Sequence, residues 1–216
     1  MCIVVAMGTN TSPEIGRPRG FDADRALERA MLVFWRHGYE GATLADLTAA
    51  MGISRTSMFA AYGNKRRLFE LALARYAQTV MAYAGRALQA PTAREVAETF
   101  LRDNVVAITA HGRPPGCFSV QGGLSCGPGN AEVSETLARS RRSGEKAMAQ
   151  RFRHAAAEGD LAPGDSPHDL ARYIMAVAEG LSVHAAAGSS REDLTRAADI
   201  ALRAFPPPAN RRSLAG

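Results

Sequence analysis

The chain has 216 residues, of which 46% are hydrophobic, so it can bury a core in one large or two small domains. Lys and Arg number 26 against 21 Asp and Glu, and the net charge of +5 favours an acidic partner without requiring one. Cys2, Cys117 and Cys126 are an odd number without CxxC spacing, so neither a disulfide framework nor a zinc knuckle is indicated.

The chain shows no signal for the membrane or for export. No segment reaches the roughly 18 consecutive apolar residues that a membrane-spanning helix needs. The apolar start MCIVVAM is short and lacks the basic leader of a signal peptide. We therefore expect a cytoplasmic protein without a membrane partner.

A disordered arm is expected over residues 1–20. Its Arg17 and Arg19 would either enter a DNA minor groove or belong to a plain tail. The first helix is predicted over 22–37, because Leu27, Met31 and Phe34 recur at i, i+4 and i+7. Gly38 is expected to end it.

Residues 43–62 predict two short helices that cross at a tight glycine turn. Thr43 can cap the first of them with its hydroxyl, and Ser54 can cap the second. Between the two, Gly52 can adopt the left-handed conformation that ends a helix. The pattern is that of a helix-turn-helix, which places a helix end in the major groove of DNA.

The second of these helices is predicted to bind double-stranded DNA through its first turn. Arg55 could pair with a guanine through O6 and N7, whereas Thr56 and Ser57 could contact either base type or a phosphate. The alternative for Arg55 is a solvated surface charge. Three apolar residues are expected to pack inward: Met58, Phe59 and Tyr62.

The rest of the chain is predicted to be helical. Asn64 can cap a long helix that reaches about residue 90, and a further helix runs from 92 to about 111. The glycine-rich run 117–130 predicts one short helix. Helices are then expected over 130–158, from the cap Ser166 and Pro167 to about 187, and from 190 to the PPP at 206–208.

A DNA-binding module alone would not need the middle helices, so we predict that they enclose a small-molecule cavity. Its expected lining is apolar and aromatic, with a few amide and hydroxyl groups. The candidates are Tyr83, Phe100, Asn104, Ile108, Phe118, Gln121, Met148, Phe152, Tyr173 and Val177. The alternative for each of them is a plain core residue.

The last two helices are predicted to form a dimer interface, because one small recognition unit buries too little surface for tight specific binding. They offer small residues for close approach and a stripe of larger apolar residues, including Ile174, Leu181 and Phe205. The alternative is that this stripe only closes the core of the single chain.

Residues 22–70 resemble the tetracycline-repressor (TetR) family of bacterial transcription regulators. The resemblance lies in FWRHGYEGATLADLTAAMGIS at 34–54, RTSMFAAYG at 55–63 and GNKRRLF at 63–69. It implies that Thr43 touches a phosphate, that residues 54–57 (Ser54, Arg55, Thr56 and Ser57) enter the groove, that Tyr62 contacts the DNA backbone and that Lys65 neutralises a phosphate. It also implies that the last two helices form the dimer and that control is by repression.

We therefore expect an all-α protein with four parts: an arm at 1–20, a three-helix helix-turn-helix domain at 21–68, a helical ligand-binding and dimerisation domain at 69–208, and a disordered tail at 209–216. The expected function is that of a dimeric repressor that leaves a palindromic operator when a small-molecule effector binds. Neither a cofactor nor a metal is predicted, because the histidines show no ligand spacing.

Two alternatives remain open at this stage. One is a regulator that responds to a partner protein or to oxidation of Cys117 and Cys126. The other is a helical enzyme or carrier that does not bind DNA. Against an enzyme, the chain contains no glycine-rich phosphate loop, no HExxH and no G-x-S-x-G.

Overall fold

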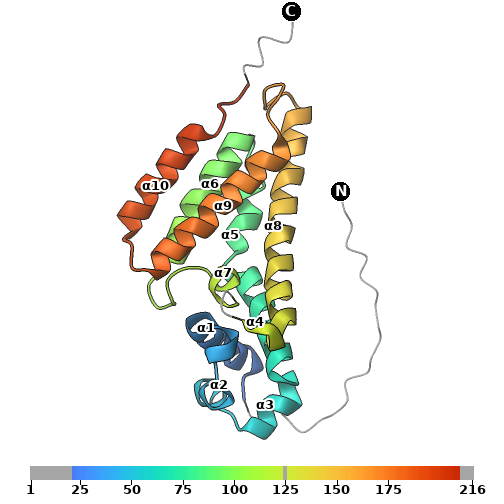
Figure 1. Ribbon diagram of the computed structural model, residues 1–216, viewed down its shortest axis with the longest axis vertical. Coiled ribbons are helices and arrows are strands. Elements are labelled where there is room, and N and C mark those ends of the chain that lie inside the picture. The colour runs from blue at the N-terminus through green and yellow to red at the C-terminus, as the bar shows by residue number, and fades with distance from the viewer. Residues whose placement is uncertain (1–20, 124–125, 210–216) are drawn as a thin grey trace, which may run out of the picture.

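The computed structural model describes residues 21–123 and 126–209. Within these ranges the chain forms ten α-helices and one 3-10 helix and contains no strand, which confirms the predicted all-α class. Figure 1 shows an elongated molecule with the first three helices gathered at one end. The predicted arm with Arg17 and Arg19, and nearly all of the predicted tail, lie outside the described residues.

The end shown at the bottom of Figure 1 is a three-helix unit made of α1 (Ala23–Gly41), α2 (Leu44–Met51) and α3 (Arg55–Tyr62). Gly52 has φ 69° and ψ 33°, the left-handed conformation predicted for the turn between α2 and α3. Gly38 has φ 69° and ψ 176°, so it breaks α1 at the predicted place, although one further helical turn follows.

Capping side chains set where most of these helices begin. Four predicted caps each accept a hydrogen bond from the backbone N–H three residues later, as expected for N-caps: Thr43, Ser54, Asn64 and Ser166. Thr43 also closes a capping box, because the Asp46 carboxylate accepts from its backbone N–H at 3.1 Å.

The prediction of one long helix from Asn64 to about residue 90 is wrong in the extent of the helix. The structure divides it into α4 (Lys65–Thr79) and α5 (Ala82–Ala87). The break falls at Val80 and Met81, directly after Thr79. Thr79 and Val80 are consecutive β-branched residues, which are poor helix formers. Because α4 runs through the predicted domain boundary at 68/69, one continuous helix belongs to both predicted domains.

The remaining elements are α6 (Ala93–Ile108), α7 (Phe118–Gln121), the 3-10 helix η1 (Pro128–Asn130), α8 (Ala131–Ala157), α9 (Pro167–Ala186) and α10 (Arg191–Ala204). The segment predicted as one short helix at 117–130 instead holds α7 and η1, separated by glycines that disfavour a continuous helix. In Figure 1 the long α8 packs along α9, and α10 lies on the outside next to α9.

The three-helix unit and the upper helices share one aromatic core. Phe69 of α4 is fully buried, and its ring meets three others edge-on at centroid distances of 5.1 to 5.3 Å: Phe34 and Tyr39 of α1, and Phe118 of α7. Such pairs stabilise beyond the area they bury. The two parts of the molecule are therefore joined by packing as well as by the continuous α4.

Among the described residues, none of the helices combines the length and the apolar character that crossing a bilayer would demand.

Candidate DNA-binding surface and ligand cavity

The first turn of α3 faces outward. Arg55 and Thr56 are exposed, and the Arg55 guanidinium lies 5.6 Å from the centroid of the Phe59 ring. Ser54 accepts a hydrogen bond from the Ser57 N–H at 3.1 Å, and the two hydroxyls are 2.9 Å apart. This turn therefore offers one cation, several hydroxyls and the positive end of a helix dipole to an anionic partner.

Phe59 does not pack inward as predicted, because 39% of its surface is exposed. Met58 and Tyr62 are the buried residues of α3, and the helical rotation places Phe59 on the same face as Arg55, four residues earlier. Sequence reasoning missed Phe59 as a residue of the candidate DNA-binding surface. Its i, i+4 spacing from Arg55 was the signal that could have identified it.

Tyr62 was expected to contact the DNA backbone, but its side chain is 7% exposed. Its hydroxyl donates a hydrogen bond to the Ala23 carbonyl at 2.7 Å, and its ring lies 6.4 Å from that of Phe21. Burial and this hydrogen bond give Tyr62 a role in fixing α3 against the start of α1, which corresponds to the core alternative.

The predicted phosphate contacts Thr43 and Lys65 differ in accessibility. Thr43 is exposed at the start of α2, and hydrogen bonds from Thr43 hold the pKa of Asp46 below its usual range. Lys65 is half-buried, with its Nζ 4.6 Å from the centroid of the Tyr39 ring. Burial lowers the pKa of Lys65, an effect opposed by the nearby carboxylate of Glu40.

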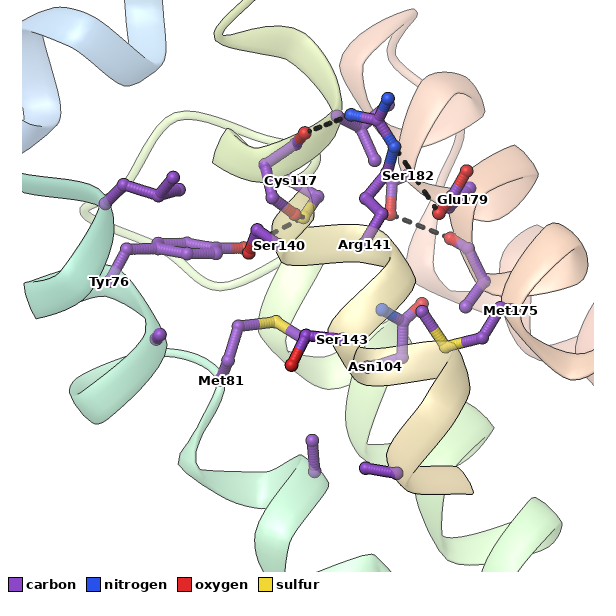
Figure 2. Close-up of a pocket in the computed structure, with 18 of the residues that line it drawn as sticks. Tyr76, Met81, Asn104, Cys117, Ser140, Arg141, Ser143, Met175, Glu179 and Ser182 are labelled. Carbon is purple, nitrogen blue, oxygen red and sulfur yellow. Dashed lines mark hydrogen bonds and ion pairs between the residues drawn. The ribbon is translucent and has the colours of Figure 1, made fainter. Parts of the chain in front are cut away.

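A cavity of about 620 Å³ opens between α4, α5, α6, α7, α8 and α9. This volume suits a drug-sized molecule, and most of the wall is apolar, with Leu73, Met81, Phe100 and Met175 among its residues. Figure 2 shows side chains from α4, α6, α8 and α9 converging on this space, together with Met81 and Cys117 at the starts of α5 and α7. The middle of the protein therefore contains the kind of space that the sequence predicted.

Three of the ten predicted lining residues border this cavity: Tyr83, Phe100 and Asn104. The structure places the other seven elsewhere. Ile108, Phe118, Met148 and Phe152 are fully buried in the core, Gln121 borders a smaller pocket beside the kink of α1, and Tyr173 and Val177 pack partly buried against the core. Helical periodicity marks which residues are buried, but it does not mark which of them face a void.

Two sets of polar groups in the wall of the cavity contact one another through their side chains. In one, Tyr76 donates a hydrogen bond to the Cys117 sulfur at 3.2 Å, while Arg141 donates to the Ser119 carbonyl at 2.8 Å and lies 3.9 Å from Glu179. In the other, Asn104 donates to the Tyr83 hydroxyl at 2.9 Å. Figure 2 shows Asn104 apart from the pair Arg141 and Glu179.

The two described cysteines are free thiols. Cys117 is buried and in contact with the hydroxyls of Tyr76 and Ser119, whereas Cys126 is half-buried outside the cavity. Burial raises the pKa of Cys126, which lowers its thiolate fraction and hence its reactivity. This chemistry does not favour the alternative of an oxidation switch.

Among residues 21–123 and 126–209, no group of three or more His, Cys, Asp or Glu side chains could hold a metal ion.

The wall of the cavity formed by α7 is tied directly to α1. The Gly122 carbonyl, which follows α7, accepts a hydrogen bond from the Tyr39 N–H at 2.9 Å, at the kink in α1. The Glu40 carboxylate accepts from the Gly127 N–H and, at 3.1 Å, from the Asn130 amide. An ion pair between Arg66 and Glu132 also ties the start of α4, directly after the three-helix unit, to α8. The cavity and the three-helix unit are thus joined by polar contacts.

An apolar stripe of α9 and α10 is left uncovered. The larger residues predicted for the dimer interface, Ile174, Leu181 and Phe205, are buried in the core of the single chain, as the alternative stated. The outer face instead carries small and β-branched residues that are exposed: Ala176, Gly180 and Val183 on α9, and Ala197, Ile200 and Ala204 on α10.

Two family sequence profiles match the chain. One, described as "Bacterial regulatory proteins, tetR family", matches residues 26–72, and the other, described as "Tetracyclin repressor-like, C-terminal domain", matches residues 98–201. The chain is 32% identical over 195 residues to the HTH-type transcriptional repressor ComR of Escherichia coli K12, covering 88% of this chain and 92% of ComR. It is 29% identical to the uncharacterised regulator YezE of Bacillus subtilis, covering 87% and 98% of the two chains.

Solved structures are similar over nearly the same span. A cysteine mutant of the TetR family transcriptional regulator CifR, complexed with 26-bp double-strand operator DNA, is 42% identical with a TM-score of 0.85, covering 88% of this chain and 100% of CifR. A putative regulator from Rhodococcus sp. RHA1 is 42% identical with a TM-score of 0.59, covering 86% and 100%. These matches exclude the helical enzyme or carrier: the chain belongs to the TetR family of transcriptional regulators.

Proposed function

We propose that the protein is a dimeric repressor that binds a palindromic operator in double-stranded DNA and leaves it when a small molecule occupies the cavity. The observation that carries the DNA-binding part is the exposed first turn of α3, with Arg55 and Thr56 at a helix N-terminus. The likeness to CifR, which was solved with operator DNA, supports this role. We place the protein in the cytoplasm, where bacterial DNA lies.

The proposed DNA contacts combine base-reading and phosphate-binding groups. Arg55, Thr56 and Phe59 form the outward face of α3, and we propose that they enter the major groove with Ser57. Thr43, Ser54 and Lys65 lie at the starts of α2, α3 and α4, where they would contact phosphates. Tyr62 would act indirectly, by fixing the angle of α3 against α1.

We propose that the exposed stripe of α9 and α10 pairs with its copy in a second chain. Ala176 and Gly180 allow two helices to approach closely, and Val183 and Ile200 supply apolar area, so a four-helix interface would form. Such a dimer would present two α3 helices to two half-sites about one helical turn of DNA apart.

Release by a ligand would use the contacts between α7 and α1. Residues 21–68 would act as the DNA reader and residues 69–208 as the ligand-binding and dimerisation part, with α4 common to both. A ligand that moved Ser119 or Val120 in the cavity wall would move the Gly122 carbonyl, which is hydrogen-bonded to α1. The ligand can lower the DNA affinity only as far as it binds the released arrangement of the protein more tightly than the DNA-bound arrangement.

Fluorescence anisotropy with DNA from upstream of the protein's own gene tests the proposal. We expect sequence-specific binding whose affinity falls steeply with salt, with a slope that corresponds to several phosphate contacts. A protein that binds this DNA no better than a scrambled duplex, or whose binding does not depend on salt, would not be a repressor of that promoter.

Arg55→Ala is expected to relax sequence preference. Loss of a bidentate contact to a guanine should remove about 1–3 kcal/mol of discrimination between the operator and variants at one position of each half-site. A competition binding assay with single-base operator variants measures this effect.

Lys65→Ala should instead weaken binding to all sequences alike and lower the salt slope by about one.

The matched control for Arg55→Ala is Arg153→Ala, which removes an arginine that is also exposed, from α8 at the other end of the molecule. We expect Arg153→Ala to leave both affinity and preference unchanged. If Arg55→Ala behaved as this control does, Arg55 would be a solvated surface charge and the groove-facing assignment of α3 would be wrong.

A further inference from the structure

The charged side chains that line the cavity balance one another. Glu70 and Glu179 carry negative charge and Arg139 and Arg141 carry positive charge, and these four are the charged residues of the wall. Arg141 faces Glu179 at 3.9 Å, Glu70 pairs with Arg67 at 3.1 Å, and Arg139 is exposed to solvent. Arg139 forms no ion pair with the described residues, but its charge is exposed and screened by water. An ion inside the cavity would lose its hydration without gaining a buried, unpaired countercharge, so the wall favours a neutral occupant.

One buried polar group of the wall lacks a partner. Asn104 is 3% exposed, its Nδ2 donates to the Tyr83 hydroxyl at 2.9 Å, and its Oδ1 accepts no hydrogen bond from the described residues. Leaving a buried acceptor unpaired costs free energy that a ligand donor would recover. The serines of α8 that border the cavity, Ser140 and Ser143, differ because they are at least partly exposed and can bind water.

Asn104 and Tyr83 together define the ligand group that would satisfy them. The Tyr83 hydroxyl accepts from Asn104 and keeps its own proton to donate, while Asn104 Oδ1 offers an acceptor. If the amide were turned by 180°, the roles would exchange, but the pair would still offer one donor and one acceptor. The complementary group must also carry a donor and an acceptor, as an alcohol or a carboxamide does. An ether or ketone lacks the donor, and an ammonium lacks the acceptor.

We propose that the cavity binds a neutral, mainly apolar molecule whose single alcohol or carboxamide group pairs with Asn104 and Tyr83. This inference rests on the proposed function, since it names the class of effector that would occupy the regulatory cavity. The apolar remainder of the ligand would contact the wall formed by Leu73, Met81, Phe100 and Met175.

A matched fragment set tests the proposal on the full-length protein. Each set has one phenylalkyl or cycloalkyl skeleton that carries in turn a primary alcohol, a carboxamide, a methyl ether, a carboxylate and a primary amine. Ligand-observed NMR should detect the alcohols and carboxamides, and should find the other three at least about tenfold weaker on the same skeleton. Preference for carboxylates or amines, or no binding by any of the skeletons, would overturn the proposal.

Two variants locate the binding group. Asn104→Leu keeps the size of the side chain but removes both polar atoms, and Tyr83→Phe removes the hydroxyl alone. Each should reduce the affinity for the alcohols by about tenfold. Asn104→Leu should leave the methyl ethers unchanged, because an ether has no proton to donate to Asn104 Oδ1. Ser143→Ala, in the same wall but exposed, serves as the control and should change neither. Circular dichroism checks that each variant is folded, and the two different substitutions give independent tests.

The same fragments separate this inference from the proposed function. Fragments that bind with the expected selectivity but leave operator binding unchanged would support the ligand class and contradict release by that ligand. Fragments that release the operator with equal strength from the wild type and from both Asn104→Leu and Tyr83→Phe would support ligand control and contradict the role of this pair.

Discussion

Ile200→Glu is expected to convert the protein from a dimer to a monomer and to lower operator affinity by at least about a hundredfold, because the two half-sites would no longer be bound together. Ile200 is 59% exposed in the single chain and lies in the apolar stripe with Ala197 and Ala204 of α10. At a dimer interface its replacement would bury two unpaired carboxylates, one from each chain. Sedimentation velocity measures the mass, and anisotropy measures the affinity.

The matched control is Val106→Glu. Val106 is 52% exposed and is also β-branched, but it lies on α6, outside the stripe formed by α9 and α10. We expect this variant to remain dimeric and to bind the operator as the wild type does. If Ile200→Glu stayed dimeric with unchanged affinity, or if the wild type were a monomer at its working concentration, the proposed interface would be wrong.

Phe69→Ala is expected to lower the free energy of unfolding by about 3–5 kcal/mol, the usual cost of removing a fully buried aromatic ring. Phe69 is 0% exposed, and its ring contacts Phe34, Tyr39 and Phe118 edge-on. These partners belong to α1 and α7, so the cavity left behind would weaken the packing between the DNA-binding unit and the cavity wall. Urea denaturation followed by circular dichroism measures the loss.

The same experiment asks whether the two parts of the protein unfold together. Because they share Phe69 and α4, the wild type should show one cooperative transition, whereas Phe69→Ala should broaden or split it. Phe59→Ala is the control, since Phe59 is 39% exposed and its removal should change stability by no more than about 0.5 kcal/mol. A loss of less than about 1 kcal/mol for Phe69→Ala would mean that these rings do not hold the two parts together.

The sequence predicted best those features that depend on a few neighbouring residues. The caps Thr43, Ser54, Asn64 and Ser166 were predicted because a hydroxyl or amide needs only the backbone N–H three residues later. Gly52 was predicted because its left-handed conformation is a local requirement. Such features also gave the helix-turn-helix and hence the family.

The sequence predicted less well which residues of a helix face the core and which face outward. Phe59 and Tyr62 are both aromatic residues of one short helix, and apolar character alone predicted both to be buried. The structure exposes Phe59 and buries Tyr62, since the rotation of α3 is set by Met58, which is fully buried, and by the bond from Tyr62 to Ala23. In an eight-residue helix, a few tertiary contacts decide which apolar residue faces outward.

By itself, the sequence determined the all-helical class, the start of nearly every helix and the helix-turn-helix, because capping, turns and periodicity act over a few residues along the chain. The tertiary structure alone decided that Asn104 faces the cavity while Ile108, one turn later on α6, faces the core. It also decided which face of α9 and α10 stays uncovered. The physical reason is that a cavity or an open face lies where several helices leave space between them, and that space depends on how all of them pack.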